Sequence, residues 1–119
     1  MKPLILELGM GADVHGHDYT KAALRAISDA IRHSSLTVFY DYGHPSEMRV
    51  EVTIGVQEPD MVDKKAVADA LPFGTVEVSV VKGGLNDTGM GGAEDIVLAS
   101  AAVKAWLDTS DHPFQLVSR

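Results

Sequence analysis

Residues 48–57 read Met-Arg-Val-Glu-Val-Thr-Ile-Gly-Val-Gln, and this stretch carries the clearest structural signal in the chain. Successive side chains of a β-strand point to opposite faces of a sheet, so this alternation predicts a strand with one buried and one solvated face. The apolar side comprises Met48, Val50, Val52, Ile54 and Val56, and the polar side carries Arg49, Glu51, Thr53 and Gln57. We therefore expect a sheet with one face covered by other elements.

Three further segments predict strands. Leu4–Leu8 and Thr75–Val81 alternate in the same way, and Leu36–Asp41 is rich in β-branched and aromatic residues. Tyr42 to Ser46 contain a glycine and a proline that favour a turn before the strand at residues 48–57.

Helical patterns separate and follow these strands. The first helix is expected from Asp18, whose side chain can cap it, to about Ser34. A second is expected from Pro59 to about Leu71, because proline is well suited to a helix start. A third is expected from about Ala93 to Leu107.

The predicted order of elements is therefore β-α-β-β-α-β-α. It corresponds to an α+β fold of the ferredoxin-like or chorismate-mutase-like kind, in which a four-stranded, mostly antiparallel sheet carries its helices on one face. The 119 residues suffice for one hydrophobic core, so we expect a single domain over residues 1–119.

The predicted third helix is apolar on almost every side. A helix of this kind has to be buried against more than one partner. We therefore expect a homo-oligomer, and a trimer or higher state suits closed rings of such domains. The sheet face away from the helices is a second candidate for the subunit interface.

The composition excludes several classes of function. The net charge of −7 and the pI near 5.0 argue against binding to nucleic acid or to an anionic membrane surface. The absence of cysteine excludes disulfides, thiolate nucleophiles and cysteine-based zinc sites. No apolar run approaches the roughly 20 residues that span a bilayer, and no signal-peptide pattern is visible, so we expect a cytoplasmic protein.

The residues most suited to chemistry lie between Gly9 and Asp18. Glycine permits tight turns and close approach of a ligand to the backbone, whereas His and Asp can transfer protons or bind metals. In an enzyme site, His15 would act as general base or acid and Asp13 would orient it. The candidate residues in this segment are the ligand-binding glycines Gly9, Gly11 and Gly16, the catalytic pair Asp13 and His15, and His17.

Two other interpretations of this segment stay open. Its carboxylates and imidazoles could bind zinc or a non-haem metal ion, with His15 and His17 among the ligands. Alternatively the residues are structural, with Asp18 as a helix cap, Asp13 as a turn residue and His15 hydrogen-bonded in a core or an interface.

A second glycine-rich segment, residues 82–92, connects a predicted strand to a predicted helix. Backbone N–H groups near Gly83 and Gly84 could bind an anionic group, with Lys82 as counter-charge. The spacing is not that of a P-loop. In a split βαβ sheet the first and fourth strands end at opposite edges, so His15 and Lys82 could share a site only across a subunit boundary.

The pattern Gly9-x-Gly11-x-Asp13-x-His15-Gly16 resembles the GxGxDxHG signature of a small uncharacterised family found in bacteria and, with a long N-terminal extension, in plants. The resemblance covers nearly the whole chain and implies no function. The Gly83-Gly84 pair is also similar to the Ser-Gly-Gly of each repeat in the ring-opening amidohydrolases, cyanuric acid hydrolase and barbiturase. Lys82 stands where those enzymes have serine, so this second resemblance concerns the fold and not the reaction.

Two functions follow as hypotheses. The first is a hydrolase-like enzyme for a small molecule, in which His15 and Asp13 perform acid–base chemistry while Lys82 and loop N–H groups stabilise an oxyanion at an intersubunit site. The second is a non-catalytic module that binds a small metabolite or a metal ion. Both imply a small-molecule ligand, self-association, and neither nucleic acid nor a membrane as partner.

Overall fold

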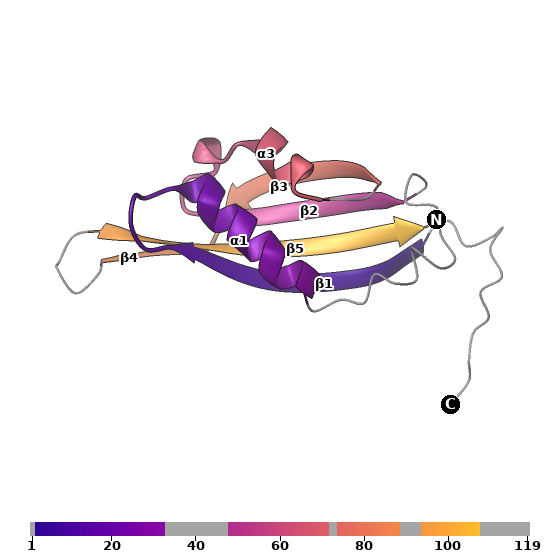
Figure 1. Cartoon of the computed structure of the whole chain (residues 1–119), viewed down its shortest axis with the longest axis horizontal. Coiled ribbons are helices and arrows are strands. Elements are labelled where there is room, and N and C mark those ends of the chain that lie inside the picture. Colours follow the sequence, from indigo (N-terminus) through magenta and orange to yellow (C-terminus); the bar gives the residue numbers. More distant parts are fainter. Residues whose placement is uncertain (1, 33–47, 72–73, 89–93, 108–119) are drawn as a thin grey trace, which may run out of the picture.

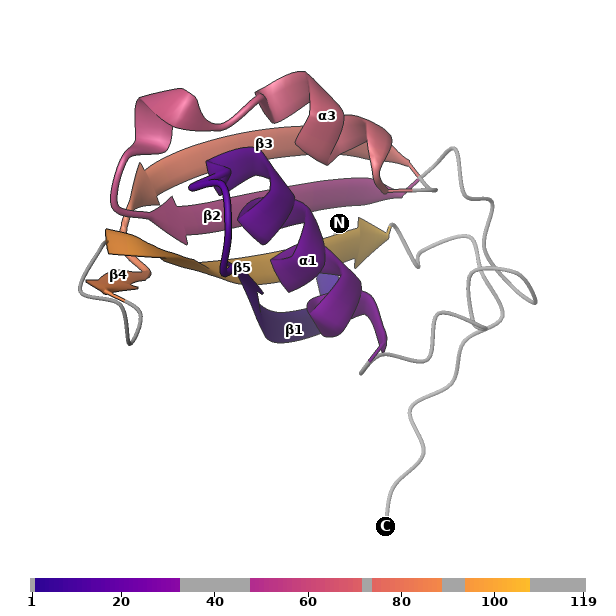
Figure 2. The same cartoon turned by 60° about the vertical axis from the view of Figure 1, so that its left-hand side comes forward.

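The computed structural model describes residues 2–32, 48–71, 74–88 and 94–107. These residues form a mixed β-sheet with helices on one face, which Figures 1 and 2 show from two sides. The elements in chain order are β1 (Lys2–Asp13), α1 (Tyr19–Arg32), β2 (Arg49–Val56), the short 3-10 helix η2 (Pro59–Met61), α3 (Lys64–Asp69), β3 (Thr75–Lys82), β4 (Leu85–Thr88) and β5 (Glu94–Leu107). The predicted α+β class is confirmed, and the described part of the sheet has five strands rather than four.

The last of the described strands, β5, lies in the interior of the sheet. The strand order is β1-β5-β2-β3, and β5 is antiparallel to both of its long neighbours, whereas β2 and β3 are parallel. β4 pairs with the first part of β5, beyond the end of β2. β1, β2 and β3 therefore run in one direction and finish at the same end of the sheet.

The core lies between the sheet and the helices. The predicted alternation in β2 is confirmed, because its even-numbered apolar residues are buried. Alternate residues of β5 are buried beside them, and α1 contributes a face of small side chains. The most enclosed large side chains are Ile27, Val52, Ile54, Val56, Val67 and Val97.

The prediction of a third helix over Ala93–Leu107 is wrong, because Glu94–Leu107 form β5. Alanine favours helices, and apolar residues occupy both alternating sets of positions, so the sequence shows no strand periodicity. In the structure the odd-numbered residues from Val97 to Ala105 are buried on the helix side. The argument for a homo-oligomer from an all-apolar third helix therefore no longer applies.

Three other boundaries differ from the sequence-based expectation. The first strand extends to Asp13, so half of the expected loop belongs to β1. Leu85–Thr88 of the expected glycine loop form β4. The expected second helix is divided, because Val62 is extended and the Asp63 side chain accepts hydrogen bonds from the first turn of α3. The predicted strand Leu36–Asp41 and the residues after Leu107 lie outside the described residues.

Two glycines allow α1 to lie directly against β1. A Cβ atom on Gly9 would stand 2.4 Å from the carbonyl oxygen of Ala26, and one on Gly11 would stand 2.3 Å from the Ala26 nitrogen. These distances are far shorter than any normal van der Waals contact. The packing of backbone on backbone therefore accounts for both glycines without a ligand.

Substitution Gly11→Ala should destabilise the fold by about 1–3 kcal/mol or more, because the methyl group overlaps the α1 backbone and neither element can move aside without disturbing the core. Urea unfolding monitored by circular dichroism measures this loss. Ser79→Ala, at an exposed strand position, is the control and should change stability by no more than about 0.5 kcal/mol. Equal stability of the two variants would contradict the packing role of Gly11.

Candidate functional site

The segment Val14–Asp18 connects the end of β1 to the start of α1 and contains both histidines of the motif. Gly16 has φ +98° and His17 has φ +57°, so two successive residues adopt left-handed conformations. This conformation is uncommon for a residue with a side chain and is found where local contacts hold it. The contacts that hold this segment involve Asp13, Asp18 and Tyr19.

Asp13 is a buried carboxylate with several partners. Its Oδ2 accepts a hydrogen bond from the main-chain N–H of Asp18 at 2.9 Å. Its Oδ1 lies 3.8 Å from Lys21 Nζ and 3.9 Å from Arg25 Nη1. The Asp18 N–H, followed by the Lys21 and Arg25 charges, holds the pKa of Asp13 below its ordinary value although burial opposes this shift. Asp13 therefore stays ionised and ties the segment to α1.

Asp18 caps α1 as predicted. Its Oδ1 accepts a hydrogen bond from the Lys21 N–H at 3.0 Å, the geometry of an N-cap. His15 is exposed, and its main-chain N–H, rather than its imidazole, contributes to lowering the pKa of Asp13. The geometry thus gives Asp13 a structural role, and an Asp13–His15 catalytic pair remains a prediction.

A second set of polar residues meets beside the first turn of α1. Tyr19 is 2% exposed, and its hydroxyl lies 3.2 Å from His17 Nε2. Asn86 of β4 donates from Nδ2 to the same hydroxyl at 2.7 Å. The imidazole and phenol rings also meet edge to face, with centroids 5.3 Å apart. We call His17, Tyr19 and Asn86 the polar triad.

The sheet brings Asp13 and the polar triad to one place. In the strand pairing, Asp13 of β1 and Asn86 of β4 lie opposite the same residue of β5, Val97, from its two sides. Both side chains lie on the helix face, below the start of α1. Sequence reasoning missed Tyr19 and Asn86, because the two are 67 residues apart and neither has a recognisable motif.

Asn86 contains an unusual buried atom. Its Oδ1 is buried and has no hydrogen-bond partner in the described part of the chain. A buried carbonyl oxygen without a donor costs about 1–3 kcal/mol, so such atoms are rare in folded proteins. The structure therefore gives this oxygen of the polar triad no partner that would offset its burial.

The second glycine-rich segment, which begins at Lys82, lies across the sheet from the end of β1. Lys82 is exposed at the end of β3, and the strand order places β5 and β2 between β3 and β1. The Gly83 N–H donates to the Val56 carbonyl at 2.9 Å, and the Gly83 and Gly84 carbonyls accept from Gln57. Gly84 has φ +63°, which the turn into β4 requires. A shared site with Lys82 remains a prediction that needs a second subunit.

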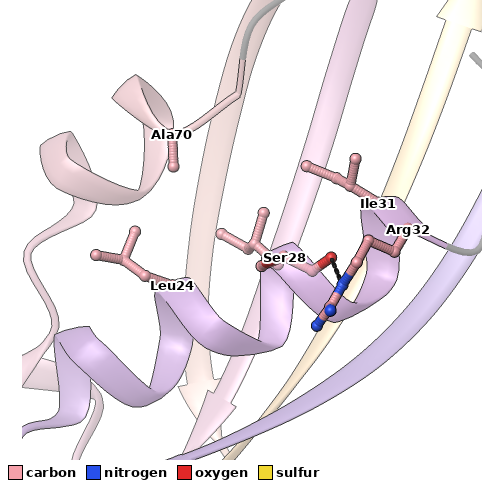
Figure 3. A pocket seen from close by; sticks show the side chains of 6 residues that line it. Leu24, Ser28, Ile31, Arg32 and Ala70 are labelled. Carbon is pink, nitrogen blue, oxygen red and sulfur yellow. Dashed lines mark hydrogen bonds between the residues drawn. The ribbon is translucent and has the colours of Figure 1, made fainter.

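The described residues offer few other features of a ligand site. Within these ranges no three His, Cys, Asp or Glu side chains cluster as metal ligands would. A pocket of about 210 Å³ lies between α1 and Ala70, lined by Leu24, Ile27, Ser28, Ile31 and Arg32, and Figure 3 shows it. It lies toward the C-terminal end of α1, away from the polar triad. No helix in the described ranges is long and apolar enough to cross a membrane.

The lowered pKa of Asp13 predicts a pH-dependent contribution to stability. A carboxylate whose pKa is lower in the folded state stabilises the fold above its ordinary pKa of 3.8, and this contribution disappears as the pH falls through the lower folded value. Asp13→Asn should therefore be less stable than the wild type at neutral pH, and the difference should shrink below pH 3.8. Urea unfolding at a series of pH values measures it. Asp18→Asn, which keeps a capping oxygen in the same segment, controls for the lost charge, and a difference independent of pH would count against the ionised role of Asp13.

Comparison with known proteins gives the chain a family. The model of a conserved hypothetical protein family, Lin0512_fam, matches residues 3–105. The crystal structure of an FtsZ-like protein of unknown function from Nostoc punctiforme PCC 73102 is similar, with 36% sequence identity and a TM-score of 0.79 over 90% of this chain and 96% of that chain. No curated protein matches. The chain therefore belongs to the conserved hypothetical family Lin0512_fam.

Proposed function

We propose that this protein acts on a small polar molecule at the junction of β1 and α1, with His17 as the acid–base group and Tyr19 and Asn86 as positioning residues. The observation that carries the proposal is the polar triad, in which an exposed imidazole is joined through a buried hydroxyl to the amide of the half-buried Asn86. Histidine is the side chain that most readily exchanges protons near neutral pH.

The triad can accommodate both protonation states of the imidazole. When His17 Nε2 is unprotonated, the Tyr19 hydroxyl donates to it and accepts from Asn86 Nδ2. When Nε2 carries a proton, it donates to the hydroxyl, which must then direct its own hydrogen elsewhere. The unpartnered Oδ1 of Asn86 can accept that hydrogen once the amide turns over. Asn86 thus supplies a donor in one state and an acceptor in the other.

A hydrolase-like reaction is the narrower form of this proposal. It would use His17 or His15 as the base and would require an oxyanion-stabilising group, for which Lys82 of a neighbouring subunit is the candidate. The resemblance of Gly83-Gly84 to the ring-opening amidohydrolases concerns the fold alone and supplies no nucleophile. The family and the Nostoc punctiforme protein have no described reaction to add.

A non-catalytic binding module is the second candidate, and one observation favours it. The Asp13 carboxylate is occupied by the Asp18 N–H, Lys21 and Arg25, and Lys82 is separated from the triad by other strands. A single histidine with positioning residues suffices to bind a ligand, whereas turnover generally requires further groups.

The first prediction concerns the hydrogen bond between Tyr19 and His17. Because Asn86 Nδ2 donates to the Tyr19 hydroxyl, the hydroxyl hydrogen is available to His17 Nε2, and a bond in that direction favours the neutral tautomer protonated on Nδ1. Tyr19→Phe should raise the population of the tautomer protonated on Nε2, which imidazole nitrogen NMR shifts report. The His15 signals of the same sample are the internal control and should not move. An unchanged His17 tautomer would contradict the triad.

The second prediction concerns ligand binding. In a thermal-shift screen of small carboxylates, amides and polar heterocycles, compounds that raise the melting temperature of the wild type should lose this effect in His17→Asn. Asparagine tolerates the left-handed backbone of residue 17, so this variant removes the imidazole with little strain. His15→Asn, in the same exposed segment, is the matched control and should keep the response. Equal responses of the two variants would refute the role of His17, whereas mass spectrometry of each binding compound separates turnover from binding alone.

A further inference from the structure

The sheet face that points away from α1 and α3 carries most of the exposed large apolar side chains. We call it the open face. Seven described large hydrophobic residues are exposed, and strand alternation places five of them here, at 48–66% exposure. These five are Leu6, Leu8 and Met10 of β1, Val81 of β3 and Leu85 of β4. Single exposed hydrophobic residues are normal on a monomer, but a contiguous group marks an interface.

The strand register shows that this group is largely contiguous. Leu8 lies opposite Ala102 of β5, and Ala12 lies opposite Leu98. On its other side, Leu98 lies opposite Leu85 of β4. An apolar band therefore runs along β1 and crosses β5 to β4. The apolar character of β5 on both faces, which misled the helix prediction, is explained if this band is covered.

The charges of the open face are nearly balanced. Its described charged side chains are Arg49 and Lys104 on the positive side and Glu51, Glu77 and Asp87 on the negative side, whereas the whole chain has a net charge of −7. Arg49 forms a salt bridge with Glu51, and both Arg49 and Lys104 lie over the Trp106 ring, at 5.5 and 5.9 Å from its centroid. The described charges of this face are therefore two positive against three negative and nearly cancel.

We propose that a second copy of this chain covers the open face, sheet against sheet. Contact between identical subunits about a two-fold axis requires a patch that is complementary to itself. An apolar band with nearly balanced charges meets this requirement, because its apolar side chains can pack against the same residues of the copy and little net charge opposes the contact. A strongly basic partner would find little charge complementarity on a face whose described charges nearly cancel. The stacking of two sheets through their inner faces is a common packing arrangement.

The state of association tests this interface. In sedimentation equilibrium over a range of concentrations, the wild type should show a multiple of the 12.7 kDa chain mass, and Met10→Glu should sediment as the 12.7 kDa monomer. Met61→Glu is the matched control, because Met61 is 63% exposed against 61% for Met10 but lies on η2, away from the open face. Met61→Glu should keep the wild-type mass. A monomeric wild type, or a Met10→Glu variant with the wild-type mass, overturns the proposal.

A second measurement does not depend on a disruptive substitution. The chain has no cysteine, so Leu8→Cys and Met61→Cys each introduce a single thiol. The alkylation rate of Cys at position 8 should fall several-fold as the protein concentration rises, because the association buries it, while the rate at position 61 stays constant. Rates that are independent of concentration at both positions would refute the interface even if Met10→Glu failed to fold.

Discussion

The close packing of α1 against β1 and β5 is the constraint on which the rest of the structure depends. Gly9 and Gly11 of β1 have no side chain toward the helix. The face of α1 that packs on them consists of small, fully buried residues, Ala22, Ala26 and Ala30. Because the two backbones are in direct contact, α1 cannot shift along the strands without a steric clash. That position sets where α1 begins and therefore where His17 and Tyr19 stand.

The glycine-rich motif consequently has a different meaning from the one that its composition suggests. Two of its three glycines belong to a strand and exist for helix packing, and its buried aspartate holds the following turn. In the function we propose, the chemistry belongs instead to His17, in the left-handed position after Gly16, and to two partners outside the motif. A ligand site of this kind is built on a rigid junction, which suits the positioning of a proton donor.

Local patterns predicted those parts of the fold in which one physical signal dominates. The alternation in β2 and β3 and the capping by Asp18 needed no knowledge of the rest of the chain. The strand over residues 94–107 resembles a helix in sequence because it is apolar on both sides and rich in alanine, and the nearness of α1 explains the small buried residues of its helix side. The polar triad could not be predicted from local patterns for a different reason. Asn86 contacts Tyr19 because β4 pairs with β5, and this pairing is not visible in the sequence. His15, Lys82 and the second glycine pair were chosen for residue type, and type does not determine where a side chain lies in space.

The central position of β5 has a consequence for how the protein forms. During synthesis, β1 with α1 and β2 with β3 can each assemble early, and among the described strands only β5, residues 94–107, pairs with both β1 and β2. β5 must insert between β1 and β2. Its pairing with β1 extends from Lys2 opposite Leu107 at one end to Asp13 opposite Val97 at the other. Contacts so distant in sequence make folding slow. Until β5 inserts, β1 and β2 each have an unpaired edge. We therefore expect the nascent chain to be most prone to aggregation just before β5 leaves the ribosome.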